Sequence, residues 1–434
     1  MTEFKELLGV GYNVSRPYIN VFIKRKDGIN SADPYETDWK RVDVINGMNR
    51  IVEYGSVKNS IDASRTSDES NFEIDDITIT FTNNDGFWNN ADDFRSYFYG
   101  FISRNKTKIK LYSAYMDTSS NLVEDQVVSG NWQYGGNIVF EGLITKVVLS
   151  DNYTAKVTAS SYLSVLNEYS VDDMSFTGAM SSSSIINAIM NQTKITAYIP
   201  YVAASLTINP YISDASKLTG TYWETIRKLA FASNSVPMLK NGTAWSVSSR
   251  TARTPQYSLS TNPDVVIDFY GQGNVNPNIY KITAYDDEGG DRCVTRWETT
   301  DGTMYIASSN DTLKLKYGEF TKQIDLSNYV GGDKYSILTT LLAYWQNPRP
   351  SIRFSCPFLV NLLSPLDKIT ITVYGKEILA GKTSYFGVSS FGDGSVFNDF
   401  TGPINISKNT QFMVVSVEKS LDDWSTIIEA ELIS

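Results

Sequence analysis

The residues of this chain that could do chemistry are its carboxylates, because the sequence contains no histidine at all. Histidine is the commonest general base and the commonest zinc ligand, so its absence excludes Ser-His-Asp triads, Cys-His dyads and HExxH zinc sites. The phosphate loop GxxxxGK[ST], the Rossmann GxGxxG after a strand and paired CxxC motifs are absent as well. What remains is chemistry that needs only two suitably spaced acids, as in glycoside hydrolysis.

Five clusters of acidic residues could supply such a pair, and turn formation explains each of them. They are Asp75-Asp76, Asp92-Asp93, Asp172-Asp173, Asp286-Asp287-Glu288 and Asp422-Asp423. Paired acids in the connections between strands are the ordinary chemistry of a solvated surface. Calcium binding is conceivable at Asp393-Gly394, but the surrounding sequence lacks the twelve-residue spacing of an EF-hand. The sequence therefore predicts no enzyme, and no catalytic, cofactor-binding or metal-binding residue.

The overall charge of the chain indicates which kinds of partner it can bind tightly. The net charge is −10, and the one compact basic run, Lys24-Arg25-Lys26, precedes an Asp27-Gly28 turn. This balance argues against tight binding of nucleic acid. An acidic surface would let DNA slide past without sticking, although negative charge also simply aids solubility. The two cysteines, Cys293 and Cys356, are too few for a disulfide framework and are expected to be buried thiols.

The elements that must position these residues are mostly strands. Val, Ile, Thr and aromatic residues alternate with polar ones in many short segments. The expected strands are 18–23, 77–81, 107–112, 138–149 paired with 153–159, 265–270, 278–285, 294–306 folded at Asp301-Gly302, 369–373, 412–417 and 424–432. No apolar run is long enough to span a bilayer, and residues 1–6 lack the features of a signal peptide, so we expect a soluble chain made in the cytosol.

Helical patterns are confined to a few places. Thr221 and Glu224 have the spacing of a capping box before an apolar face, and Asn241-Gly242 then marks a hairpin turn between 236–239 and 243–247. Residues 181–190 predict a second capped helix, and 161–168 a short one. A further helical face, Leu338, Leu341, Leu342 and Trp345, ends before Pro348 and Pro350.

These elements suggest three regions in a chain of 434 residues. Residues 1–170 form a first β region with a long polar loop at 115–137, residues 171–255 a small α+β module, and residues 256–434 a second β region. The regions could be discontinuous in sequence. Long loops in compact domains tend to carry contacts, and exposed aromatics on loops anchor interfaces. Trp132 and Tyr134 are therefore candidate interface residues, unless their rings fold back onto the sheet below.

The order of the elements resembles the tail hub, or baseplate hub, proteins of tailed bacteriophages and related injection systems. The matching pieces are Thr82-Asn83-Asn84-Asp85-Gly86-Phe87, Phe140-Glu141-Gly142-Leu143-Ile144, the helix and hairpin of 221–247, the helix before Pro348, and the closing pair 412–417 and 424–432. They span nearly the whole chain. Each motif is loose by itself, and the order of the motifs carries the likeness.

The resemblance implies a mainly β fold, with two tail-tube-like β-barrels plus a small helix-and-hairpin module. It also implies a homotrimer whose six barrels join a sixfold tail tube to a threefold fibre or spike at the virion tail tip, around a channel for DNA. The implied partners are the tail tube or distal tail protein, the central fibre or spike and the tape measure protein; DNA passes without specific binding. A carbohydrate-binding or carboxylate-dependent glycan-cleaving β protein remains the alternative, as does a distal tail or receptor-binding component.

Overall fold

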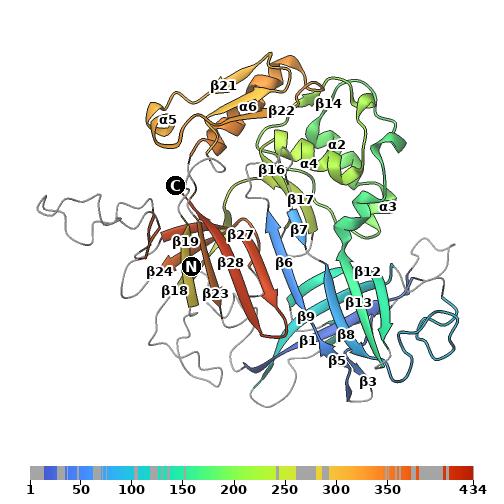
Figure 1. The fold of residues 1–434 in the computed structure, drawn as a ribbon. Helices are drawn as coiled ribbons and strands as arrows, with labels where there is room; N and C mark the ends of the chain where they lie inside the picture. The colour runs from blue at the N-terminus through green and yellow to red at the C-terminus, as the bar shows by residue number, and fades with distance from the viewer. Residues whose placement is uncertain are drawn as a thin grey trace, which may run out of the picture.

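The computed structural model describes most of the chain. The described residues are 14–26, 35–36, 38–45, 48–61, 70, 72–74, 76–101, 106–117, 126–128, 131–133, 137–150, 153–240, 244–260, 280–285, 293–347, 349, 351–356, 359–360, 363–372, 378–380, 404–406 and 410–433. The expected strand 265–270, the Asn241-Gly242 turn, the cluster at 286–288 and Asp393 lie outside them. The fold is mainly β with a minor helical module, as the sequence predicts (Figure 1).

The first sheet is a curled half-barrel of seven antiparallel strands. Its order is β2 (Lys40–Arg41), β1 (Val14–Lys24), β9 (Lys108–Asp117), β12 (Asn137–Ser150), β13 (Thr154–Ser161), β8 (Ile77–Thr82) and β5 (Ile51–Glu53). Alternation along β8 explains its two faces, because Ile77, Ile79 and Phe81 are fully buried while Thr78 is exposed. The short pairs β3 (Val44–Ile45) with β4 (Met48–Asn49), and β10 (Gln126–Val128) with β11 (Asn131–Gln133), lie outside this sheet.

The second sheet has eight strands and takes two of them from the N-terminal part of the chain. Its main path is β18 (Arg253–Ser260), β24 (Asp367–Thr372), β27 (Thr410–Ser420), β28 (Ser425–Leu432), β23 (Ser351–Cys356) and β19 (Tyr280–Tyr285). Strand β6 (Ser56–Ile61) pairs with β27, and β7 (Phe72–Ile74) pairs with β6. Residues 1–170 thus supply strands to both sheets, and the limits of the three predicted regions stay a prediction. The pair β25 (Ile378–Ala380) and β26 (Ile404–Ile406) stands apart.

A helical layer lies beyond the ends of both sheets (Figure 1). It contains η1 (Tyr162–Asn167), η2 (Val171–Asp173), α2 (Ser182–Met190), α3 (Thr193–Thr196), η3 (Ala215–Lys217) and α4 (Tyr222–Ala232), with the pairs β14 (Met180–Ser181) and β15 (Tyr211–Ile212), and β16 (Ser235–Lys240) and β17 (Ala244–Ser249). The capping box is confirmed, since Thr221 and Glu224 exchange hydrogen bonds at the start of α4. The short helix expected at 161–168 is a 3-10 helix.

Residues 293–347 form a small lobe against this layer. Strands β21 (Tyr305–Ala307), β20 (Arg296–Thr299) and β22 (Thr321–Ile324) make a three-stranded sheet, accompanied by α5 (Asp311–Tyr317) and α6 (Gly331–Trp345). The predicted fold-back at Asp301-Gly302 is confirmed by the antiparallel pairing of β20 with β21. The predicted face of α6 is buried in one hydrophobic core with α2, α4 and β16. We call residues 293–347 the α5–α6 lobe.

Both cysteines are buried thiols, as predicted. Burial raises the pKa of the Cys356 thiol to about 12. Within the described part of the chain, no helix is long and apolar enough to cross a membrane.

Candidate interaction surface

One loop of the first sheet follows β8 and runs from residue 83 to residue 101; we call it the aromatic loop. Its first turn is built on Asn83. The side-chain oxygen of Asn83 accepts a hydrogen bond from the Trp88 backbone N at 2.8 Å. The side-chain amide nitrogen of Asn83 donates to the Asn89 side-chain oxygen at 2.9 Å. Gly86 has a φ of +76°, and a Cβ there would lie 2.9 Å from the Asn89 amide nitrogen. The sequence around Asp85-Gly86 therefore folds as one tight turn.

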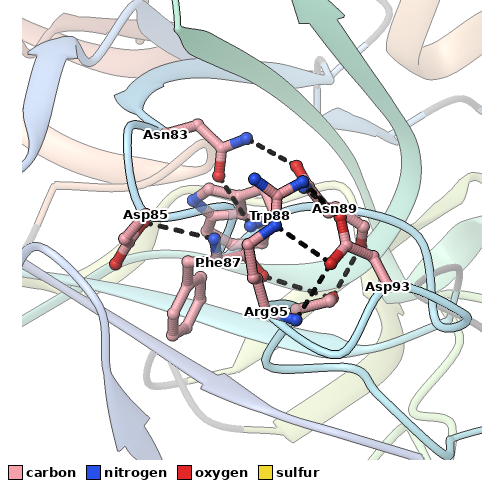
Figure 2. Close-up of polar contacts among 8 residues, drawn as sticks. Asn83, Asp85, Phe87, Trp88, Asn89, Asp93 and Arg95 are labelled. Carbon is pink, nitrogen blue, oxygen red and sulfur yellow. Dashed lines mark hydrogen bonds and ion pairs between the residues drawn. The ribbon is translucent and has the colours of Figure 1, made fainter.

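A second turn of the aromatic loop is closed by Asp93 and Arg95 (Figure 2). The Asp93 carboxylate accepts from the Arg95 backbone N at 2.9 Å, from Arg95 Nε at 3.1 Å and from Arg95 Nη2 at 2.8 Å. It also accepts from the Asn89 amide at 2.6 Å, which joins the two turns. The hydrogen bonds from Arg95 hold the pKa of the Asp93 carboxyl well below its ordinary value. The Asp93 carboxylate therefore stabilises the fold of the loop, and Arg95 balances its charge.

Buried rings fix the aromatic loop onto the sheet. Trp88 and Phe98 are fully buried in the core of the first sheet, and Trp88 lies 4.7 Å from Phe81 of β8 between ring centroids. Phe87 stacks on Tyr97, with 4.9 Å between centroids and 4° between ring planes. The Arg25 guanidinium covers the outer face of Tyr97 at 3.8 Å and pairs with Glu36. A loop with this many fixed groups holds its surface residues in defined positions.

Three aromatic side chains are left exposed by this arrangement. Phe94, between the two partners of the Asp93–Arg95 ion pair, is 80% exposed, and Tyr99 is 57% exposed. Tyr153, 68% exposed at the β12–β13 turn, is tied to the loop because its backbone carbonyl accepts from Asn83 N at 2.6 Å. Exposed aromatic side chains on a rigid support are typical anchors of protein interfaces. These three side chains are therefore the candidate interaction residues of the aromatic loop and the neighbouring turn.

The α5–α6 lobe exposes a second group of apolar side chains. Leu315 of α5 is 89% exposed, Tyr305 of β21 is 60% exposed and Tyr335 of α6 is 58% exposed. Arg296 lies over the Tyr305 ring at 4.3 Å, so this tyrosine is held in place. The helix α5 is well bounded, because the Asn310 side chain accepts from Leu313 N and Gly318 ends the helix at a φ of +84°.

The interface residues predicted from the sequence, Trp132 and Tyr134, belong to neither of these two groups. Trp132 is part of β11, opposite Val127 of β10, so the expected loop at 115–137 contains a short hairpin. Tyr134 lies outside the described residues. Their interface role stays a prediction. The aromatic loop was not predicted as a surface, although seven aromatic residues between positions 87 and 101, set among Asn, Asp and Gly, were the available signal.

The acidic clusters within the described residues belong to separate elements. Asp92 is exposed, Asp172 and Asp173 belong to η2, and Asp422 lies in the β27–β28 turn. Among the residues that can be described, no three acids or thiols gather closely enough to hold a metal ion.

This combination of a curled antiparallel half-barrel, a second sheet that shares N-terminal strands, and a helical layer beyond their ends defines the class of fold. The same fold occurs in the tail protein from Neisseria meningitidis MC58, at 11% sequence identity and a TM-score of 0.50 over 96% of each chain. The 43 kDa tail protein of prophage MuSo2 from Shewanella oneidensis matches at 9% identity and a TM-score of 0.48, covering 96% of this chain and 98% of that one.

A third solved structure, prophage tail protein gp18 from Listeria monocytogenes EGD-e, matches at 9% identity and a TM-score of 0.44, over 95% of this chain and 94% of that one. No protein-family model and no curated protein sequence matches the chain.

Proposed function

We propose that this chain is a structural, non-enzymatic protein of a phage tail, and more particularly the hub at the tail tip. The observation that carries the proposal is the shared fold with a tail protein over 96% of both chains, which leaves no large part of the chain to a different architecture. The order of motifs in the sequence supports the same class independently.

The hub proposal adds an assembly. Three copies, each with two large β sheets, would place six sheets around one axis, which suits a junction between a sixfold tube and a threefold fibre or spike. The partners would be a tube or distal tail protein on one side, a fibre or spike on the other, and the tape measure protein and DNA in the channel. The net charge of −10 supports passage of DNA without tight binding.

The rigid exposed aromatics support a protein that works through contacts. Phe94 and Tyr153 are presented by a hydrogen-bonded framework, which lowers the conformational entropy lost when a partner binds. A glycan-cleaving protein would instead need two acids facing one site, and Asp93, the most strongly bonded acid of the aromatic loop, is held by Arg95.

Light scattering on the purified chain, together with negative-stain imaging, tests the proposal. We expect a mass of three chains and a ring with a central opening. A chain that stays monomeric at high concentration and binds or cleaves bacterial polysaccharide would overturn the hub proposal.

A further inference from the structure

The two large sheets of this chain repeat one arrangement of strands. The first sheet contains the path β1-β9-β12-β13-β8-β5, and the second sheet contains the path β18-β24-β27-β28-β23-β19. The chain also visits each path in the same order, starting at one edge strand, continuing at the opposite edge strand and ending with the central hairpin. The paths differ at one end, where β1 and β9 are antiparallel but β18 and β24 are parallel. The two sheets are therefore counterparts, with β5 corresponding to β19 and the β12–β13 hairpin to the β27–β28 hairpin.

The two central hairpins also match locally. The first strand of each hairpin, β12 or β27, has an irregularity in its register. The residue just before the second strand is an aromatic residue at positive φ, Tyr153 at +55° and Trp424 at +54°. Positive φ is uncommon for bulky side chains, so its recurrence at the same place supports the correspondence. The β27–β28 turn is longer by one residue.

The hairpin of the second sheet is buried against the first sheet of the same chain. Leu421 lies in the core of the first sheet, and Trp424 packs against that core. Leu421 N donates to the carbonyl oxygen of Gly55, in the short link that follows β5, at 3.0 Å. Strand β6 continues from this link and pairs with the second half of β27, from Ser416 to Ser420. One junction thus joins the β5 edge of the first sheet to the β27–β28 hairpin of the second.

The corresponding part of the β12–β13 hairpin is open. Strand β12 pairs with β9 only as far as Leu143, and among the residues that the structure describes no strand lies beside 145–150 on that side. This end of the hairpin exposes three apolar side chains, Val148 at 44%, Leu149 at 42% and Tyr153 at 68%. Clustered exposed apolar side chains are typical of interaction sites. The first sheet therefore has a hairpin suited to a junction that one chain does not form.

We propose that the β12–β13 hairpin of one copy packs against the β19 edge of the second sheet of another copy, as β27–β28 packs against the β5 edge within one chain. The occupant is a second copy, because β19 is the counterpart of β5 in the repeated path. In Figure 1 β19 lies at the left and β12 and β13 lie at the right, so the contact joins two chains. Such head-to-tail contacts close into a ring when the rotation between copies fits.

The inference rests on the proposed function, because it names the contact that would join the copies of the hub. Each sheet of the ring would then meet the next through the same kind of junction, once within a chain and once between chains.

Photo-cross-linking tests the pairing directly. The chain carries the photoreactive residue benzoylphenylalanine in place of Tyr153, is mixed with isotope-labelled wild-type chain, and is irradiated. We expect mass spectrometry to find position 153 joined to a labelled peptide that contains β19, residues 280–285. The same probe in place of Tyr335, 58% exposed on α6, is the matched control and should not capture that peptide. Equal capture from both positions, or capture of a different labelled segment from position 153, would overturn the pairing.

A charge placed in the contact gives a second measurement on the full chain. Leu149→Arg should raise the concentration at which the trimer dissociates by about tenfold or more, because an interface residue would become an unpaired buried cation. Circular dichroism should be unchanged, since the side chain at position 149 is exposed in the single copy. Tyr335→Arg is the control and should leave dissociation unchanged.

The outcomes separate the two proposals. If the wild-type chain is a trimer that Leu149→Arg does not weaken, the pairing is wrong and the hub proposal stands. If the wild-type chain is a monomer at every concentration, both fail.

Discussion

The carboxylate of Asp422 holds the backbone at Gly55, where the chain crosses from the first sheet to the second. Asp422 accepts from Gly55 N at 2.9 Å and from Tyr54 N at 2.8 Å, and the neighbouring Leu421 N donates to Gly55 O at 3.0 Å. Gly55 has a φ of +75°, and a Cβ there would meet the Thr78 carbonyl oxygen at 2.8 Å. Leu421 is buried in the core of the first sheet. The β27–β28 turn thus fixes one sheet to the other.

Replacing Asp422 with Ala should therefore lower the free energy of unfolding by about 1–3 kcal/mol, because two backbone amides lose a charged acceptor. Chemical denaturation measures the change. Asp423→Ala is the matched control, since Asp423 is the equally exposed neighbour and its carboxylate accepts from the Ser420 hydroxyl at 3.0 Å, with no backbone amide of Tyr54 or Gly55 bound to it. Equal effects of the two substitutions would show that Asp422 is an ordinary turn residue.

Gly142 of β12 lies where β12 and β13 approach each other closely, so a substitution there tests the packing of the two strands. A Cβ at position 142 would lie 2.1 Å from the Ser160 carbonyl oxygen, a backbone atom that cannot move aside without shifting β13. Gly142→Ala should cost several kcal/mol, on the order of a severe overpacking substitution. Gly331→Ala, at the open start of α6 with nothing within 4 Å, should be neutral or slightly stabilising. Thermal unfolding of both variants gives the comparison, and a stable Gly142→Ala chain would contradict the strand packing.

Trp223 of α4 is buried in the large core that α4 shares with α2, β16 and α6. Trp223→Ala should lower the free energy of unfolding by roughly 3–5 kcal/mol, as for other large aromatic truncations. Assembly should be lost only to the extent that folding is lost. Circular dichroism and light scattering on the same sample decide this, and a well-folded variant that fails to bind its partners would give Trp223 a direct role in binding.

Asp367 should make stability depend on pH. Burial raises the pKa of its carboxyl from 3.8 to about 6, against the opposing effects of Arg253, 2.9 Å away, and the Ser364 backbone N, 2.8 Å away, with the buried Lys419 also contributing. The folded chain then keeps a proton that the unfolded chain releases above pH 4, so Asp367 makes stability fall as pH rises from about 4 to about 6.

The Asp367→Asn variant isolates this dependence, because Asn keeps an acceptor for Ser364 N but does not titrate. Urea unfolding between pH 4 and pH 6 should show a less negative slope of stability with pH in Asp367→Asn than in the wild-type chain. Asp423→Asn, at an exposed site, should keep the wild-type slope. Parallel curves for wild type and Asp367→Asn would exclude a raised pKa.

Local patterns predicted the elements well. Thr221 and Glu224 are three residues apart, so the capping box that begins α4 depends on neighbours in sequence alone, and the alternation that buries Ile77 and Ile79 is equally local. The contribution of an N-terminal strand to the second sheet could not be predicted in this way. Strand β6 pairs with β27, some 360 residues later, and no local pattern carries that information.

The candidate surface shows the same limit. The aromatic residues between 87 and 101 are visible in the sequence, but only the folded chain separates Trp88, fully buried, from Phe94, which is exposed. The sequence favours Trp132 and Tyr134 as interface residues because their segment has the composition of a long polar loop. That segment contains the paired strands β10 and β11, and polar composition gives no signal for this pairing.

The sequence by itself determined the mainly β class, the helix of 222–232 with its cap, the burial of both cysteines and the exclusion of histidine chemistry. These follow from composition and from interactions within a few residues. The tertiary structure alone decided that Asp422 holds the backbone at Gly55, that β6 joins the second sheet, and that Phe94 and Leu315 are exposed to solvent. Each depends on contacts between segments distant in sequence, whose pairing is selected by the packing of the whole chain.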